Sequence, residues 1–308
     1  MNNFIKYFYG VDIDKVIYND KYYSFIYGGY VYRLYIYEGS NDEIKFLHEI
    51  NRQLVGNTLM SELVVNRNKE IVSSYNGVSY VLIRVFVNVN KGITLSEISF
   101  VSRMLSNSGI IVDWGLLWSK KIDYLEDLIN ENGRKYPLIV DSFNYFVGMA
   151  ENAIGYFNSI NVDKTFDKNY RYVISHKVIK DNDSVEVLYN PLNITFDYRV
   201  RDVAEYVKNS FFNGNCNIFN ELILYLKREN LSLLEVRLLI SRLLYPSFYF
   251  EMYEDILIDN KEEKILVDVI SRLDDYEDYL ARVIVFLRVH YDVDEVLWLK
   301  RRFVSGAL

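Results

Sequence analysis

The first ninety residues alternate apolar and polar positions in short stretches that end at turn-forming pairs. Residues 22–38 (YYSFIYGGYVYRLYIYE) hold two stretches rich in Tyr, Val and Ile, separated by Gly28-Gly29. Asn76-Gly77 separates two further apolar stretches within residues 61–88. Gly-Gly and Asn-Gly tolerate the positive φ angles that two-residue hairpin loops require. The pattern therefore predicts antiparallel strands joined by tight turns.

One segment of this region has the period of a helix instead. In residues 43–55 (EIKFLHEINRQLV), five side chains fall on one face of a helix: Ile44, Leu47, His48, Ile50 and Leu54. Ser40 or Asn41 can cap its start. Strands, one helix and further strands predict a small α+β lobe.

From Thr94 onward the apolar spacing is mainly helical. Thr94 and Glu97 match a capping box. Residues 114–130 (WGLLWSKKIDYLEDLIN) predict a helix that places Leu117, Lys121, Tyr124, Leu125 and Leu128 along one face. Two strands within residues 171–197 interrupt the helices. The change near residues 87–94 predicts a first lobe over 1–88 and a second over 89–308.

Composition and charge narrow the function classes. The chain of 308 residues is 50% hydrophobic and carries 35 basic and 42 acidic residues, a net charge of −7. A nucleic-acid-binding role is not expected, because it needs a surplus of Lys and Arg that neutralises phosphates. No uninterrupted apolar run approaches the ~20 residues of a transmembrane helix, and the N-terminus lacks the pattern of a signal peptide. We expect a soluble, cytoplasmic protein; its oligomeric state does not follow from the pattern.

The spacing of the histidines and of the single cysteine predicts neither a metal site nor a catalytic nucleophile. His48, His176 and His290 form no metal-binding motif, and Cys216, the single cysteine, has no activating histidine in sequence and no partner for an internal disulfide. Residues 298–303 (WLKRRF) form a short basic and aromatic cluster. It is either a solvated helix end or a contact for an anionic partner.

The order of these elements resembles a two-lobe protein-kinase-like fold, and the detail is similar to the aminoglycoside phosphotransferase branch. Within it, the chain resembles the spore-coat-associated kinase-like proteins of endospore-forming bacteria, the YutH-like and CotS-like proteins. The stretches that carry the resemblance are YVYRLYIYE (30–38), EIKFLHEINRQL (43–54), DWGLLWSKKIDYLEDLI (113–129), NPLNITFDYRVRDVAEYVK (190–208) and LLYPSFYFEMYEDIL (243–257). The resemblance implies a small antiparallel β lobe with one helix and a larger, mainly helical lobe.

The resemblance also implies where a nucleotide would be held. Arg33 stands at the position of the nucleotide-binding lysine, and the helix with Glu49 is the one that supplies the lysine's partner. The planar guanidinium of arginine has a different reach from an ammonium group. We therefore expect Arg33 to form a surface ion pair with Glu49 rather than to hold phosphate.

The catalytic loop departs furthest from an active phosphotransferase. His176-Lys177-Val178 stands where the family's enzymes have His-Gly-Asp, and a valine cannot accept a proton. Asp183 stands at the position of a metal-binding asparagine, in a segment that we interpret as a turn. Asp197 stands at the metal-binding aspartate, and Asp202 is interpreted as a structural residue at a helix N-terminus.

We therefore predict a catalytically inactive kinase-like protein, a pseudokinase, that acts through contacts with other proteins. Resemblance places those partners among spore coat components and implies association with the forming spore coat; no cofactor is expected. The alternative is an active phosphotransferase, acting on a small molecule or a protein, with relocated carboxylates at Asp181, Asp183 and Asp197. That alternative requires ATP and Mg²⁺.

Overall fold

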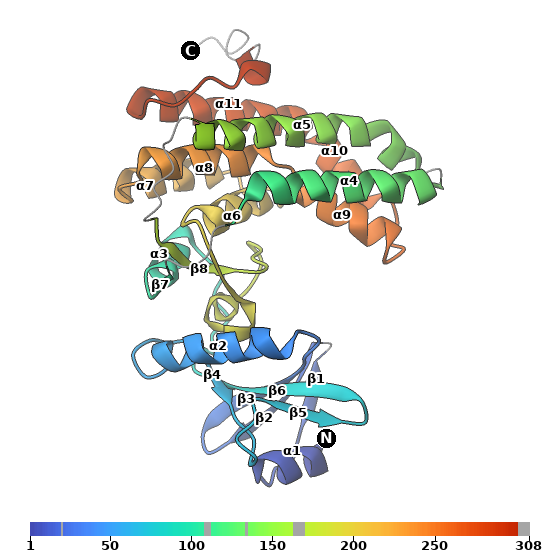
Figure 1. The fold of residues 1–308 in the computed structure, drawn as a ribbon, viewed down its shortest axis with the longest axis vertical. Coiled ribbons are helices and arrows are strands. Elements are labelled where there is room, and N and C mark those ends of the chain that lie inside the picture. Colours follow the sequence, from blue (N-terminus) through green and yellow to red (C-terminus); the bar gives the residue numbers. More distant parts are fainter. Residues whose placement is uncertain (20, 108–111, 133–134, 163–169, 301–308) are drawn as a thin grey trace. The chain divides into compact units, whose positions relative to one another are not determined.

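The computed structural model describes residues 1–19, 21–107, 112–132, 135–162 and 170–300. Its contacts divide the chain into two compact units (Figure 1). The first comprises residues 1–93, 100–105 and 176–195, and the second comprises residues 94–99, 106–175 and 196–308. The predicted combination of an antiparallel sheet lobe and a larger helical part is confirmed.

The first unit is built on an antiparallel sheet. Its strands are β1 (Ile17–Asn19), β2 (Tyr22–Tyr27), β3 (Tyr30–Ile36), β4 (Glu62–Val64), β5 (Val72–Tyr75) and β6 (Val78–Val85). They are ordered β1-β2-β3-β6-β4, and β5 also pairs with β6. Gly28 and Gly29 connect β2 to β3 with φ angles of 58° and 83°, as the hairpin prediction requires. Asn76-Gly77 connects β5 to β6 in the same way.

Helix α2 (Asn41–Leu54) belongs to the same unit, and its start is confirmed. The Ser40 side chain accepts a hydrogen bond from the Glu43 N–H at 3.1 Å, so Ser40 is the N-cap. The predicted apolar positions are buried except for His48, which is half-buried. Asn51 joins the helix to β4, because its side-chain oxygen accepts the Leu63 N–H at 2.8 Å.

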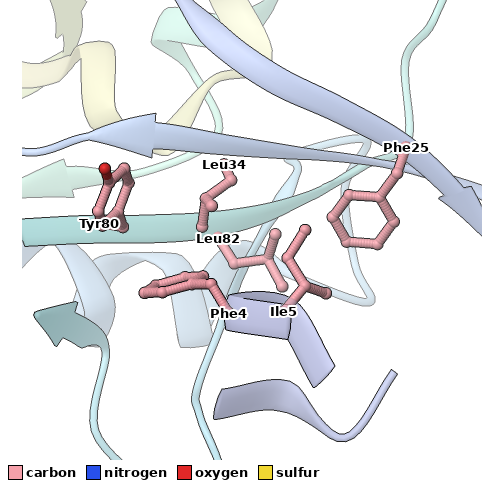
Figure 2. Packing of buried hydrophobic residues seen from close by; sticks show 6 residues of the cluster. All are labelled: Phe4, Ile5, Phe25, Leu34, Tyr80 and Leu82. Atoms are coloured by element: carbon pink, nitrogen blue, oxygen red, sulfur yellow. The ribbon is translucent and has the colours of Figure 1, made fainter. Parts of the chain in front are cut away.

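The first unit also contains a helix that the sequence analysis did not predict, α1 (Asn2–Tyr9). Figure 2 shows Phe4 and Ile5 of α1 against side chains of β2, β3 and β6. The buried cluster consists of Phe4, Ile5, Phe25, Leu34, Tyr80 and Leu82. Phe4 and Phe8, and likewise Ile5 and Tyr9, are four residues apart, which is the spacing of a helix. A helix of eight residues is too short to be stable alone, and the burial of Phe4 and Ile5 anchors it.

The second unit is mainly helical. Its helices after residue 106 are α4 (Trp114–Asn132), α5 (Pro137–Val162), α6 (Arg201–Phe212), α7 (Ile218–Arg228), α8 (Leu233–Leu244), α9 (Ser247–Leu257), α10 (Ile265–Ser271) and α11 (Leu273–His290). Helix α8 begins with a capping box between Ser232 and Glu235, and every residue from Leu234 to Leu244 is buried. A helix that is buried on all sides forms the core of a helical domain.

The buried face of α4 differs from the predicted one. Gly115, Trp118, Ile122 and Leu125 are buried, whereas Leu117 is 45% and Tyr124 is 42% exposed. Of the residues predicted along one face, Leu125 is buried, whereas Leu117 and Tyr124 lie on an exposed side of the helix. The buried face of α4 is the one that carries Trp118, because the Trp118 ring stacks on Tyr245 with ring centroids 4.4 Å apart.

The segment that follows β8 (Tyr172–His176) returns to the first unit. Strand β8 lies between β7 (Ser106–Asn107) and β9 (Ile194–Asp197) in a second sheet, whose strand order is β7-β8-β9. Between β8 and β9 in the chain, two short 3₁₀ helices cover Val185–Tyr189 and Pro191–Asn193. The Val185 N–H bonds the Lys91 carbonyl at 2.7 Å, and the Ser61 N–H bonds the Tyr189 carbonyl at 3.0 Å. Residues 176–195 therefore pack with the first unit, although the sequence prediction placed them in the second lobe.

Candidate functional site

A pocket of about 630 Å³ lies within the first unit, between the strands β1 to β3 and the segment 178–193. It is lined by Asn19, Lys21, Tyr22, Arg33, Tyr35, Val178, Lys180, Asp183, Ser184, Glu186, Val187, Asn190, Leu192 and Asn193. Three predicted site residues therefore share one pocket: Arg33, Val178 and Asp183.

Arg33 is held inside this pocket by its own neighbours. Its Nη2 lies 2.6 Å from Glu186 Oε2, and the two side chains are 14% and 15% exposed. Its guanidinium also lies over the Tyr22 ring at 4.8 Å. Tyr22 and Tyr35 are cross-strand neighbours with ring centroids 5.1 Å apart, and burial raises the pKa of Tyr35. The Arg33 charge is thus neutralised in a largely buried ion pair.

The predicted ion pair between Arg33 and Glu49 is wrong. Glu49 lies on α2 with an exposed side chain and pairs with Arg52 at 3.6 Å. Glu49 stands on the side of α2 opposite the buried stripe of Ile44 and Leu47, because a helix advances about 100° per residue. Glu186 was not predicted, since no local pattern connects it to β3.

The catalytic-loop position is shaped by Asn193, which sequence reasoning also missed. Its Oδ1 accepts the Val178 N–H at 3.1 Å, and its Nδ2 donates to the Val178 carbonyl at 2.8 Å. His176 is buried, and its Nε2 lies 3.1 Å from the Leu188 carbonyl oxygen. The Val178 side chain itself is 56% exposed. The loop is therefore maintained by amide and imidazole contacts, with an aliphatic side chain at its tip.

Asp183 closes a turn, as the sequence interpretation proposed. Its carboxylate accepts the Lys180 N–H at 2.9 Å, and its own N–H bonds the Lys180 carbonyl at 3.1 Å. Asp181 lies in the same turn and is half-buried.

Asp197 belongs to the second unit, where it is 2% exposed. Its Oδ1 accepts hydrogen bonds from the Trp114 Nε1 at 2.9 Å and from the Tyr198 N–H at 2.7 Å. Its Oδ2 lies 3.2 Å from Arg242 Nη2 and 3.3 Å from Arg201 Nε. Both carboxylate oxygens are thus engaged by groups of the chain itself.

The partner Arg242 is part of a larger buried network. It lies on α8, 4.2 Å from the centre of the Trp114 ring, and its Nη1 is 3.6 Å from Glu205. Glu205 also pairs with Lys208 at 3.0 Å. Burial lowers the pKa of Lys208, whose ammonium donates to the carbonyls of Arg242 and Tyr245. Asp197 and Arg242 are more than forty residues apart in the sequence, so no local pattern could have predicted that they pair.

The other candidate residues do not assemble into a second centre. Asp202 is buried in the first turn of α6, one position after the helix start; Val200 is the N-cap. Across the part of the chain that the structure describes, no group of three His, Cys, Asp or Glu side chains could hold a metal ion. Cys216 is exposed with a free thiol. Of the cluster 298–303, residues 301–303 lie outside the described residues.

No helix within the described ranges is long and apolar enough to cross a lipid bilayer.

Comparison with known structures supports the fold. An aminoglycoside phosphotransferase from Alicyclobacillus acidocaldarius superposes with a TM-score of 0.64 at 11% identity, covering 92% of this chain and 93% of that chain. A spectinomycin phosphotransferase, solved in complex with ADP and spectinomycin, superposes with a TM-score of 0.57 at 14% identity, covering 98% and 96%. At these identities the likeness shows the fold alone.

Comparison with known sequences supports the family. The endospore coat-associated protein YutH of Bacillus subtilis is 29% identical over 212 residues, and the alignment spans 62% of each protein's length. The family described as "Spore coat putative kinase YutH" matches residues 2–283. Because that match covers most of the chain, the protein belongs to the YutH family of kinase-like spore coat proteins.

Proposed function

We propose that this protein is a catalytically silent member of its kinase-like family and acts through contacts with other proteins during spore coat assembly. The observation that carries the proposal is the engagement of Asp197 by Arg201 and Arg242 in a buried site. By resemblance, Asp197 stands at the metal-binding position of a phosphotransferase, and its carboxylate is paired with two cations of the chain itself, which supports the proposal.

The energetic argument concerns what a magnesium ion would have to displace. Removing one partner of a buried ion pair costs about 3–5 kcal/mol, because the remaining charge is left without compensation. A metal ion at Asp197 would push away two guanidinium groups, one of which also lies over the Trp114 ring. Mg²⁺ further needs near-octahedral oxygen ligands, and the Asp197 oxygens are directed at N–H donors.

A second argument concerns the first unit. Phosphoryl transfer in this fold depends on a cation at the position of Arg33 that holds the phosphates and on a carboxylate that receives the substrate proton. Arg33 is neutralised by Glu186, and Val178 offers no acid or base at the loop tip. These features support a retained shape without the corresponding chemistry.

The proposed role at the spore coat is based on the Bacillus subtilis relative. The Bacillus subtilis protein is described as endospore coat-associated, and the alignment covers 62% of its length. We propose the same setting for this chain, with coat components as its partners and no nucleotide or metal required.

The test combines a thermal-shift titration with an assay of phosphate release. We expect no change in melting temperature with ATP or ADP in the presence of Mg²⁺ or Mn²⁺, and no turnover of ATP. A nucleotide that binds the folded chain would stabilise it by about 2.7 kcal/mol at a hundredfold excess over Kd. Stabilisation together with turnover would overturn the proposal.

The alternative, an active phosphotransferase, has one observation in its favour: Asp183, Lys180 and Arg33 line the same pocket. It predicts that Asp183→Asn abolishes turnover while Asp127→Asn, an exposed change on α4, leaves turnover intact. A chain that shows neither stabilisation by nucleotide nor turnover of ATP would exclude this alternative, since phosphoryl transfer requires ATP to bind first.

A further inference from the structure

Some of the charged side chains that line the pocket of the first unit are paired with one another, and others are not. Three basic and two acidic side chains line it: Lys21, Arg33, Lys180, Asp183 and Glu186. Both carboxylates are already bonded, Glu186 to Arg33 and Asp183 to the Lys180 N–H. The Lys21 and Lys180 ammonium groups are exposed, and neither has an ion-pair partner among the described residues. The uncompensated charge of the pocket is therefore positive, in a chain whose net charge is −7.

This arrangement suits a carboxylate better than a triphosphate. A triphosphate brings several negative charges that need a metal ion, and the Asp183 and Glu186 carboxylates would repel it. A carboxylate side chain brings one charge, which a lysine ammonium can meet without a metal. Tyr22 and Tyr35 offer aromatic walls for the aliphatic part of such a side chain.

The strand next to the pocket favours a polypeptide over a small acid. Strand β1 ends the strand order among the described strands, and its Asn19 lines the pocket. Ile17 and Tyr18 of β1 are 56% and 57% exposed. An edge strand presents backbone N–H and C=O groups that an extended peptide can pair with.

We infer that this pocket receives an acidic segment of a partner protein, whose carboxylates meet Lys21 and Lys180 and whose backbone runs along β1. The inference rests on the proposed non-catalytic function, because it assigns a protein ligand to the pocket that a nucleotide would otherwise enter. Arg33, fixed by Glu186, shapes the floor of the site and leaves contact with the ligand to the two lysines.

The experiment measures binding of acetylated, amidated hexaglutamate to the full chain by fluorescence anisotropy. We expect binding that weakens as salt is added, and no binding of the matched hexaglutamine. The double variant Lys21→Glu/Lys180→Glu should weaken binding about tenfold, which corresponds to about 1.4 kcal/mol for two exposed pairs. The control Lys45→Glu/Lys120→Glu makes the same charge change at exposed helix positions away from the pocket and should change Kd less than about twofold.

Milder variants keep the test valid if charge reversal impairs folding. Lys21→Gln/Lys180→Gln should weaken binding in the same direction, with an unchanged melting temperature. Equal weakening by the control pair, or hexaglutamate binding no tighter than succinate, overturns the inference.

A parallel titration with ATP and Mg²⁺ separates this inference from the proposed function. Nucleotide binding lost in the Lys21 and Lys180 variants would overturn both. A chain that binds neither ATP nor hexaglutamate would overturn the acidic-segment inference alone.

Discussion

The ion-pair partner of Arg33 depends on the tertiary structure around it. Its position on β3 follows from the strand pattern, but its partner Glu186 lies more than 150 residues further along the chain. The expected partner Glu49 is excluded by helix geometry alone, since it stands opposite the buried stripe of α2. Helical periodicity could therefore have removed Glu49 from consideration, whereas only packing could supply Glu186.

Asn193 makes the same point for the loop that holds Val178. Its two hydrogen bonds to the Val178 backbone maintain the loop without any help from the Val178 side chain. A substitution at Val178 therefore changes chemistry at the loop tip while the backbone contacts persist.

Restoring the missing acid tests whether Val178 alone silences the chain. We expect Val178→Asp to release no phosphate from ATP with Mg²⁺, because Arg33 remains paired with Glu186 and Asp197 remains paired with Arg242. Phosphate release measured against Val178→Asn, a neutral side chain of similar size, checks this. Turnover in the aspartate variant alone would show that a single residue carries the loss.

Among the elements, α4 shows how an apolar pattern misleads. It carries one stripe with Trp118, Ile122 and Leu125 and another with Leu117 and Tyr124. Sequence periodicity identifies the helix, and both stripes satisfy it. Tertiary packing selects the first stripe because the Trp118 ring stacks on Tyr245.

Two leucine substitutions on α4 test which face of the helix contributes to the stability of the second unit. Leu125→Ala should destabilise the second unit by about 2–5 kcal/mol, since Leu125 is fully buried, and Leu117→Ala by less than about 0.5 kcal/mol. Urea unfolding followed by circular dichroism gives both values. Equal losses would mean that the exposed stripe is covered in solution.

For the whole molecule, buried tyrosines link stability to alkaline pH. Burial raises the pKa of Tyr9 in the first unit and of Tyr249 in the second to about 12, from 10.0. A tyrosine whose pKa is higher in the folded state binds its proton more tightly there. Its contribution is complete below pH 10 and is lost as pH rises toward 12.

We therefore expect the free energy of unfolding to fall as pH rises through this range, by about 2 kcal/mol for each such tyrosine. Urea unfolding at a series of pH values checks the slope. Tyr249→Phe should make the fall smaller by the share of one tyrosine, and Tyr124→Phe, at an exposed position of α4, should leave the fall unchanged. A profile that stays level to pH 12 in the unmodified chain would contradict the assignment.

Local sequence determined the hairpins at Gly28-Gly29 and Asn76-Gly77, the capped start of α2 at Ser40 and the valine at the loop tip. Each depends on the residue itself or on neighbours within one turn, where φ preferences and capping bonds act. Tertiary structure decided the partners of Arg33 and Asp197, the return of residues 176–195 to the first unit and the buried face of α4. These depend on side chains that are distant in sequence, and a buried charge accepts whichever opposite charge the folded chain brings within hydrogen-bonding distance.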